Sequence, residues 1–190
     1  MEHPLNAVQV AVEKAVVQGK LIFAAAANSG GLMSRAYPAK FNGVVCVHAT
    51  DGQGNPAEFN PDPGTGVDNF ATAGVAIGTE WKGKETNVSG TFYAVPVAAG
   101  IAANILDLAH TRLTEEEDRL HVQSLYRYSG MRSMLSWMSR QRGGYDNLRP
   151  WILFPPREGG VMDSHIDEAY ENIRKAMLYS RVPEAWRSKT

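Results

Sequence analysis

Two hydrophobic patterns follow one another at the start of the chain, one typical of a helix and the other of a buried strand. In residues 4–19, five apolar side chains recur at helical spacing and predict an amphipathic helix; they are Leu5, Val8, Val12, Ala15 and Val16. Residues 21–27, LIFAAAA, form a continuous apolar run, as expected of a strand covered on both faces in a parallel sheet. A helix followed by such a strand indicates an α/β fold.

Further strands and turns follow in the next fifty residues. The apolar run 44–47, VVCV, predicts a second strand, and residues 68–74 predict a short third one. Residues 51–55, DGQGN, contain two glycines one residue apart, but the third glycine of a phosphate-binding loop is absent and no helical pattern follows. We therefore interpret this segment as a turn.

The segment from Phe92 to about His110 is small and apolar, and it predicts a helix that is buried on much of its circumference. The apolar positions that define it are Val97, Ala98, Ile101, Ala102, Ile105 and Leu108. It is preceded by Ser89-Gly90-Thr91, a sequence typical of a helix start.

After His110 the composition changes, and we expect a helical extension over residues 111–190, following an α/β domain over residues 1–110. Residues 114–117, TEEE, have the pattern of a capping box, and residues 130–140 predict a short helix. Gly143, Gly144 and Pro150 indicate loop. A last helix, capped by Asp163 or Ser164, is predicted from the spacing of Ile166, Tyr170, Ile173 and Met177.

Composition narrows the class of protein. With 190 residues, 44% hydrophobic and 21% charged, the chain has the composition of a globular protein, and at a net charge of −1 its Lys and Arg residues form no basic block. Nucleic acid and anionic membranes are therefore not expected as partners. A single cysteine, Cys46, permits no intramolecular disulfide, and the first residues lack the pattern of a signal peptide. We found no window of about 18 consecutive apolar residues and expect a cytoplasmic protein.

Two turns carry the candidate chemistry. Asn28 follows the predicted buried strand, and residues 87–100, NVSGTFYAVPVAAG, open the apolar helix. Taken alone, an Asn after a strand is a routine loop residue, and a Gly-Thr pair is a routine helix start. Together with LIFAAAANSGG, AYPAKFNGVVCVHATDGQGN and VDNFATAG, however, they resemble the C-terminal half of the catalytic domain of the subtilisin-like serine proteases, the subtilases. The resemblance covers roughly residues 4–110.

The resemblance implies a partial three-layer αβα fold with a parallel sheet, and a peptide or protein as ligand. In the family, a Ser at a helix N-terminus attacks the substrate, and an Asn side chain helps to stabilise the oxyanion. Asn28 matches that oxyanion-hole Asn, while Phe92 occupies the position of the nucleophilic Ser. Gly90 and Thr91 keep the family pattern before it.

Three departures from the family pattern matter. A phenyl ring cannot attack a carbonyl, so Phe92 removes the nucleophile. The family's Asp and His motifs precede the opening helix and are not found in this sequence, so we expect a missing N-terminal half or a partner chain to complete the domain. Ala27 stands where the family commonly has Gly, and Ala tolerates a positive φ poorly.

The sequence is compatible with several functions. The first is a pseudoenzyme or truncated subtilase that binds peptides or acts as a regulatory part of a longer protein. The second is a working serine endopeptidase in which Phe92 is a local divergence, and the third is an interaction module whose helical tail binds a partner. That tail resembles extensions that follow subtilisin-like domains in some fungal intracellular proteins.

Alternative chemistries have less support. A Ser89–His48 pair would need a base, an orienting acid and an oxyanion site to come together by coincidence. We interpret His48 instead as a strand residue with a local hydrogen bond. The spacing of His, Cys and Asp residues fits neither a zinc site nor an EF-hand, so no metal and no cofactor are predicted.

Overall fold

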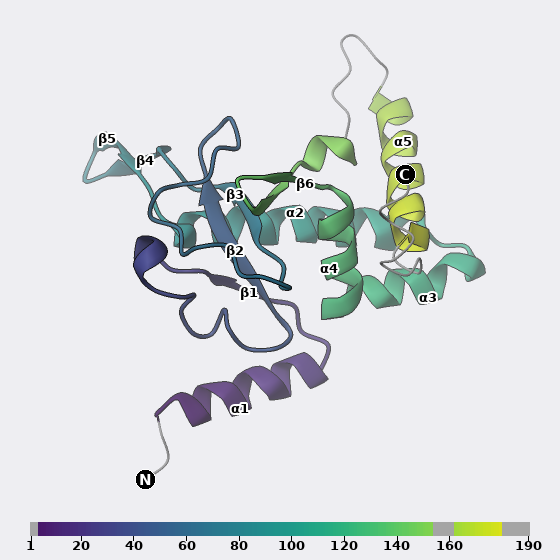
Figure 1. Ribbon diagram of the computed structural model, residues 1–190. Coiled ribbons are helices and arrows are strands. Elements are labelled where there is room, and N and C mark those ends of the chain that lie inside the picture. The colour runs from purple at the N-terminus through teal and green to yellow at the C-terminus, as the bar shows by residue number, and fades with distance from the viewer. Residues whose placement is uncertain (1–3, 154–161, 180–190) are drawn as a thin grey trace.

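The computed structural model describes residues 4–153 and 162–179, and Figure 1 shows their helices and strands. In chain order these are α1 (Pro4–Val17), β1 (Ile22–Ala25), η1 (Gly30–Leu32), β2 (Val44–Thr50), β3 (Phe70–Ala73), β4 (Ile77–Trp81), β5 (Lys84–Val88), α2 (Thr91–Arg112), α3 (Glu116–Leu125), α4 (Tyr128–Trp137), β6 (Ser139–Arg142), β7 (Tyr145–Leu148), η2 (Pro150–Ile152) and α5 (Met162–Tyr179). The predicted α/β class is confirmed.

A five-stranded sheet in the order β1-β2-β3-β7-β6 forms the centre of the fold. The pairs β1–β2, β2–β3 and β3–β7 are parallel, and β6 runs antiparallel to β7. Strands β4 and β5 form a separate antiparallel hairpin, which projects from the fold at the end away from α5 (Figure 1). In the part of the chain that the structure describes, no strand pairs with the outer side of β1, so β1 is an edge strand.

Strand β2 shows how the sheet is covered on both faces. Its residues alternate between two hydrophobic clusters, because successive side chains of a strand point to opposite faces. Val45 and Val47 belong to the cluster that includes the buried side of α2, whereas Val44 and Cys46 belong to the cluster that contains Val12 of α1. Helices α2 and α1 therefore lie on opposite faces of the sheet, which gives three layers.

Helix α2 supplies most of one face. Its buried side consists mainly of alanines, which allow the helix to approach the strands closely; the buried apolar residues are Ala94, Ala98, Ala102, Ile105 and Ala109. Residues Thr91–Thr111 also have the length and hydropathy of a membrane-spanning helix, although the sequence analysis found no such window. Only 28% of this apolar window is buried, and α2 packs against β1, β2 and β3.

The C-terminal part contains strands as well as helices. Helices α3, α4 and α5 pack together, and the Arg174 guanidinium on α5 pairs with the Asp118 carboxylate on α3 at 2.5 Å. The β6–β7 hairpin, however, was not predicted, and β7 joins the main sheet beside β3. The two parts of the chain thus share one sheet, while the predicted domain boundary at residue 110 stays a prediction.

Two predicted helix starts are wrong in detail. The N-cap of α3 is Glu115 and makes no side-chain capping bond, so residues 114–117 form no capping box. Helix α5 begins at Met162, which places Asp163 and Ser164 inside the helix and not at its cap.

Candidate functional site

The start of α2 is attached to the ends of two strands. Gly90 is the N-cap of α2, and its backbone N–H donates to the carbonyl oxygen of Gly74, just beyond β3, at 2.9 Å. A Cβ on Gly74 would lie 2.9 Å from the Gly90 oxygen and 3.0 Å from the Ala94 Cβ. Only a glycine therefore fits where this loop meets the first turn of α2, a contact that the sequence analysis did not single out.

The structure brings Asn28 and Thr91 into direct contact. The Asn28 Oδ1 atom accepts the Thr91 backbone N–H at 2.8 Å and the Thr91 hydroxyl at 3.0 Å. Because a backbone N–H needs an acceptor, this bond determines that the Asn28 oxygen faces Thr91 and that its Nδ2 group faces away. Thr91 itself is fully buried. The Asn28 amide thereby presents its N–H groups to the space beside Gly90.

Two kinds of donor lie close to Gly90. A Cβ placed on Gly90 would lie 3.1 Å from the Asn28 Nδ2 atom, so this amide lies directly beside the Gly90 backbone. The Phe92 backbone N–H belongs to the first turn of α2, where N–H groups have no intrahelical acceptor. Donors of this kind, at the positive end of a helix dipole, stabilise an anion or a polarised carbonyl oxygen.

The Phe92 side chain covers this arrangement. Its Cε1 and Cζ atoms would lie 2.7 and 2.9 Å from a Cβ on Gly90, so the ring lies over the open side of that glycine. The ring is tilted against Tyr93, with 4.4 Å between the centroids, and 53% of the Phe92 residue surface is exposed. A hydrocarbon ring therefore lies where the resemblance places a nucleophilic hydroxyl.

Ala27, just before Asn28, has a strained backbone. Its φ is 139°, a value that side chains with a Cβ rarely adopt. The loop thus keeps a conformation suited to glycine although the residue has changed. This agrees with the expectation from the sequence that Ala27 would conflict with the backbone of the loop.

His48 and Ser89 form no catalytic pair. His48 on β2 is fully buried, its Nδ1 atom lies 3.1 Å from the Phe70 carbonyl oxygen on β3, and its ring meets the Tyr145 ring edge-on. Burial lowers the pKa of His48 to about 4, helped by the nearby Arg35 charge, while the Phe70 bond partly opposes this shift. Ser89 is exposed, and its hydroxyl accepts the Ala76 N–H at 2.9 Å. The local hydrogen bond predicted for His48 goes to the neighbouring strand.

Metal-binding residues do not cluster in the described chain. Within residues 4–153 and 162–179, no group of three or more His, Cys, Asp or Glu side chains is placed to hold a metal ion. The Asn28–Thr91 turn offers donor groups to a ligand and no acceptor set for a cation.

Sequence comparisons identify relatives of known type. The family model described as the subtilase family matches residues 2–148. Subtilisin DY of Bacillus licheniformis is 37% identical over 104 residues, which are 53% of this chain and 38% of that protein. M-protease of Shouchella clausii is 37% identical over 101 residues, 53% of this chain and 26% of that protein. A subtilisin-like protease 2 of the fungus Pseudogymnoascus destructans is 33% identical over 105 residues, 54% of this chain and 26% of that protein.

Solved structures share the fold. The prenylagaramide maturation protease PagA superposes with a TM-score of 0.59 at 21% identity, covering 87% of this chain and 55% of that one. The PatG macrocyclase domain superposes with a TM-score of 0.61 at 17% identity, covering 92% of this chain and 48% of that one.

The family match agrees with the parallel sheet and with the Asn28–Thr91 contact at the start of α2. The chain spans between about a quarter and two fifths of the length of the curated relatives named above. The family model covers well over half of this chain, from α1 to β7. The chain belongs to the subtilase family.

Proposed function

We propose that this chain is a subtilase-family protein that does not hydrolyse peptides at the start of α2 and that binds peptide there instead. The observation that carries the proposal is the Phe92 ring over Gly90, next to the Asn28 amide. Acyl transfer needs a nucleophile with a lone pair and a base that takes up its proton. A phenyl ring supplies neither.

The other residues considered from the sequence do not replace the nucleophile. Ser89 is engaged by the Ala76 N–H, and His48 lies in the sheet interior against Phe70 and Tyr145. A general base must reach the proton that it removes, and a fully buried imidazole cannot reach an exposed loop hydroxyl. This supports an inactive site in the described part of the chain.

Peptide binding is supported by the donors that remain. The Asn28 Nδ2 group and the Phe92 N–H suit a peptide carbonyl oxygen, and the exposed Phe92 ring offers apolar contact beside them. Binding without hydrolysis would suit a regulatory role within a larger assembly.

A fluorophosphonate probe tests the inactivity. Such probes react covalently with activated serine hydroxyls, and we expect no labelling of the 190-residue chain, with subtilisin DY as the positive control. Labelling that disappears in a Ser89→Ala variant would overturn the proposal, because it would identify Ser89 as an activated nucleophile. Peptide binding is tested separately by fluorescence anisotropy with a labelled casein peptide, which an Asn28→Leu variant should bind more weakly.

A second candidate is an endopeptidase in which position 92 alone has diverged. The intact Asn28–Thr91 contact favours it, because the groups around the missing nucleophile are still in place. We expect the outer edge of β1 to be completed by a segment that carries the family's Asp and His motifs, in the same polypeptide or in a partner chain. Phe92→Ser combined with such a segment would then cleave casein, whereas an inert, folded complex would exclude this candidate.

A third candidate is an interaction module in the C-terminal part. The exposed side chains of Leu120 and Tyr126 on and after α3 favour it, because large apolar groups at the surface suit a protein contact. A Leu120→Glu variant that loses partners captured by the wild-type chain, while still binding peptide at Asn28, would support it.

A further inference from the structure

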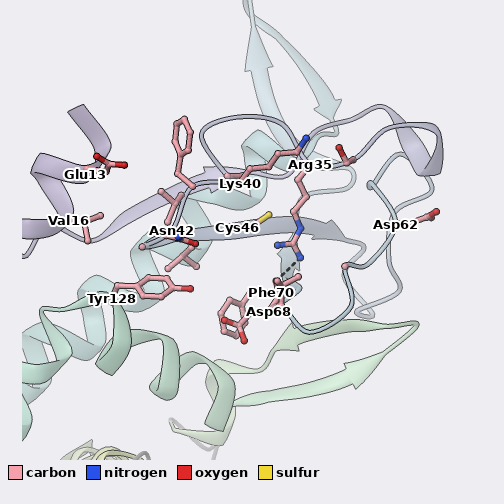
Figure 2. Close-up of a pocket in the computed structure, with 18 of the residues that line it drawn as sticks. Glu13, Val16, Arg35, Lys40, Asn42, Cys46, Asp62, Asp68, Phe70 and Tyr128 are labelled. Atoms are coloured by element: carbon pink, nitrogen blue, oxygen red, sulfur yellow. Dashed lines mark hydrogen bonds between the residues drawn. The ribbon is translucent and has the colours of Figure 1, made fainter. Parts of the chain in front are cut away.

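A cavity of about 850 Å³ opens on the sheet face opposite α2, away from the Asn28–Thr91 turn. Figure 2 shows it between α1, the loop that carries Arg35 and Lys40, strand β2 and Tyr128 of α4. Its walls are mainly apolar and include Val16, Phe41, Val44 and Phe70, with the Cys46 thiol between them. None of Asn28, Gly90, Thr91 and Phe92 lines it, so it is distinct from the candidate site.

Arg35 brings a positive charge to this cavity without a matching carboxylate. Its Nη2 atom donates to the Asp68 carbonyl oxygen and to the Asn69 side-chain oxygen, both of which are uncharged acceptors. Its Nε atom is buried and has no hydrogen-bond partner. Within the described residues no salt bridge involves Arg35. Arg35 lines the cavity, so its guanidinium charge is within reach of an anion bound there.

The acidic side chains near the cavity are engaged or turned away. Both carboxylate oxygens of Asp68 accept hydrogen bonds from Arg132. Glu13 accepts a bond from Gln9 at 2.8 Å, and Figure 2 shows its carboxylate at the far end of the cavity from Arg35. Asp62 is exposed and points away from the guanidinium (Figure 2). The charge that Arg35 places at the cavity is therefore left for a bound anion.

We propose that this cavity binds a carboxylate with an apolar body, such as a medium-chain fatty acid, with the carboxylate on Arg35. The carboxylate pairs with the Arg35 guanidinium through Nη1, because Nη2 already donates to Asp68 and Asn69 and Nε is buried. The apolar body lies along Val16, Phe41 and Val44, where it is removed from water. A volume of about 850 Å³ is within the range of pockets that enclose small molecules.

Isothermal titration calorimetry on the full 190-residue chain tests the proposal with decanoate and with decanol, which has the same chain length and no charge. We expect decanoate to bind at least about tenfold more tightly, since hydrogen bonds to charged groups are the stronger ones. An Arg35→Met variant should lose this preference and still bind decanol. Arg119→Met, at an exposed position on α3 outside the cavity, is the matched control and should keep the preference.

A second variant and a second readout remain decisive if Arg35→Met does not fold. Val16→Trp fills the cavity from α1 without touching the bonds of Arg35, and it should weaken the binding of both decanoate and decanol. Cys46 is the only cysteine of the chain and lines the cavity, so bound decanoate should slow its reaction with N-ethylmaleimide several-fold.

Several results would overturn the proposal. Equal affinity for decanoate and decanol would show that Arg35 recognises no anion, and absence of binding by either would show that the cavity takes no amphiphile. Unchanged decanoate binding in Val16→Trp would place the ligand elsewhere. Octyl phosphate binding in preference to decanoate would replace the carboxylate by a phosphate ester.

Discussion

Two places in this fold carry residue types associated with hydrolysis, and the structure treats them in opposite ways. At the start of α2, Asn28 and Thr91 are joined by hydrogen bonds, and the Asn28 amide N–H groups lie beside Gly90, next to the Phe92 ring. In the sheet interior, His48 is fully buried between Phe70 and Tyr145. The first place keeps the geometry for recognising a carbonyl and lacks a nucleophile, whereas the second keeps a potential base where no substrate can reach it.

This contrast separates recognition from reaction. Donor groups are held by the backbone at the start of α2, so they survive a change of one neighbouring side chain. Acid–base chemistry depends on an ionisable group that meets its reactant, and burial removes His48 from that role. Changes at His48 should therefore alter stability and its pH dependence, whereas changes around α2 should alter a binding surface.

The largest expected effect is a loss of stability in acid caused by His48. Burial lowers its pKa from 6.5 to about 4, so between these values the unfolded chain binds a proton that the folded chain does not. The free energy of unfolding should consequently decrease as the pH falls from about 6.5 to about 4, by about 3 kcal/mol for this group. Urea unfolding measured across this range would show it.

A variant pair isolates the contribution of His48. His48→Gln removes the titrating group and keeps a side-chain donor for the Phe70 carbonyl, so its unfolding free energy should depend much less on pH. Gln in place of the exposed His110 should leave the dependence as in the wild type. Equal slopes in the two variants would mean that His48 is not the group responsible.

The second effect concerns the Asn28–Thr91 contact. Asn28→Leu leaves the buried Thr91 N–H and hydroxyl without their acceptor, so we expect a loss of about 2 kcal/mol in unfolding free energy. Asn28→Asp retains an acceptor for both groups and should be destabilised much less. Guanidinium unfolding of the two variants measures the difference, and equal stability would show that Thr91 finds another acceptor.

The third effect has the opposite sign. Ala27→Gly relieves the strain at a φ of 139°, and we expect a gain of about 1 kcal/mol, because the strain exceeds the added entropy of the unfolded glycine. Ala25→Gly, in β1, has no such strain to relieve and should destabilise the chain. Thermal unfolding of the pair should therefore shift in opposite directions, and a parallel shift would contradict the assigned strain.

Much of this architecture follows from local sequence pattern, and the exceptions have physical reasons. Local pattern predicted helix α1, strands β1 to β3 and helix α2, because buried elements carry continuous or periodic apolar residues. The β6–β7 hairpin was missed because SRQR and YDNL show no such pattern, and β7 is stabilised by pairing with β3, far away in the sequence.

In the candidate site too, some features were indicated by the sequence and others result from packing. The resemblance grouped Asn28 with the turn at Gly90 and Thr91, but it did not predict the hydrogen bonds between Asn28 and Thr91. The position of the Phe92 ring over Gly90 and the unpaired Arg35 Nε result from side-chain packing between distant segments. No local pattern in the sequence encodes them.

The smallest effect on stability should come from Phe92 itself, where the effect on chemistry matters most. With 53% of its surface exposed and Tyr93 as its ring contact, replacement by Ser should change the unfolding free energy by less than about 0.5 kcal/mol. The new hydroxyl would lie beside the Asn28 amide but would have no base, because His48 is buried. Phe92→Ser should therefore fold normally and, like the hydroxyl-free control Phe92→Ala, stay unlabelled by a fluorophosphonate probe. Labelling of Phe92→Ser alone would mean that a base outside the described contacts reaches position 92, and recognition and reaction would then be separated by this one side chain.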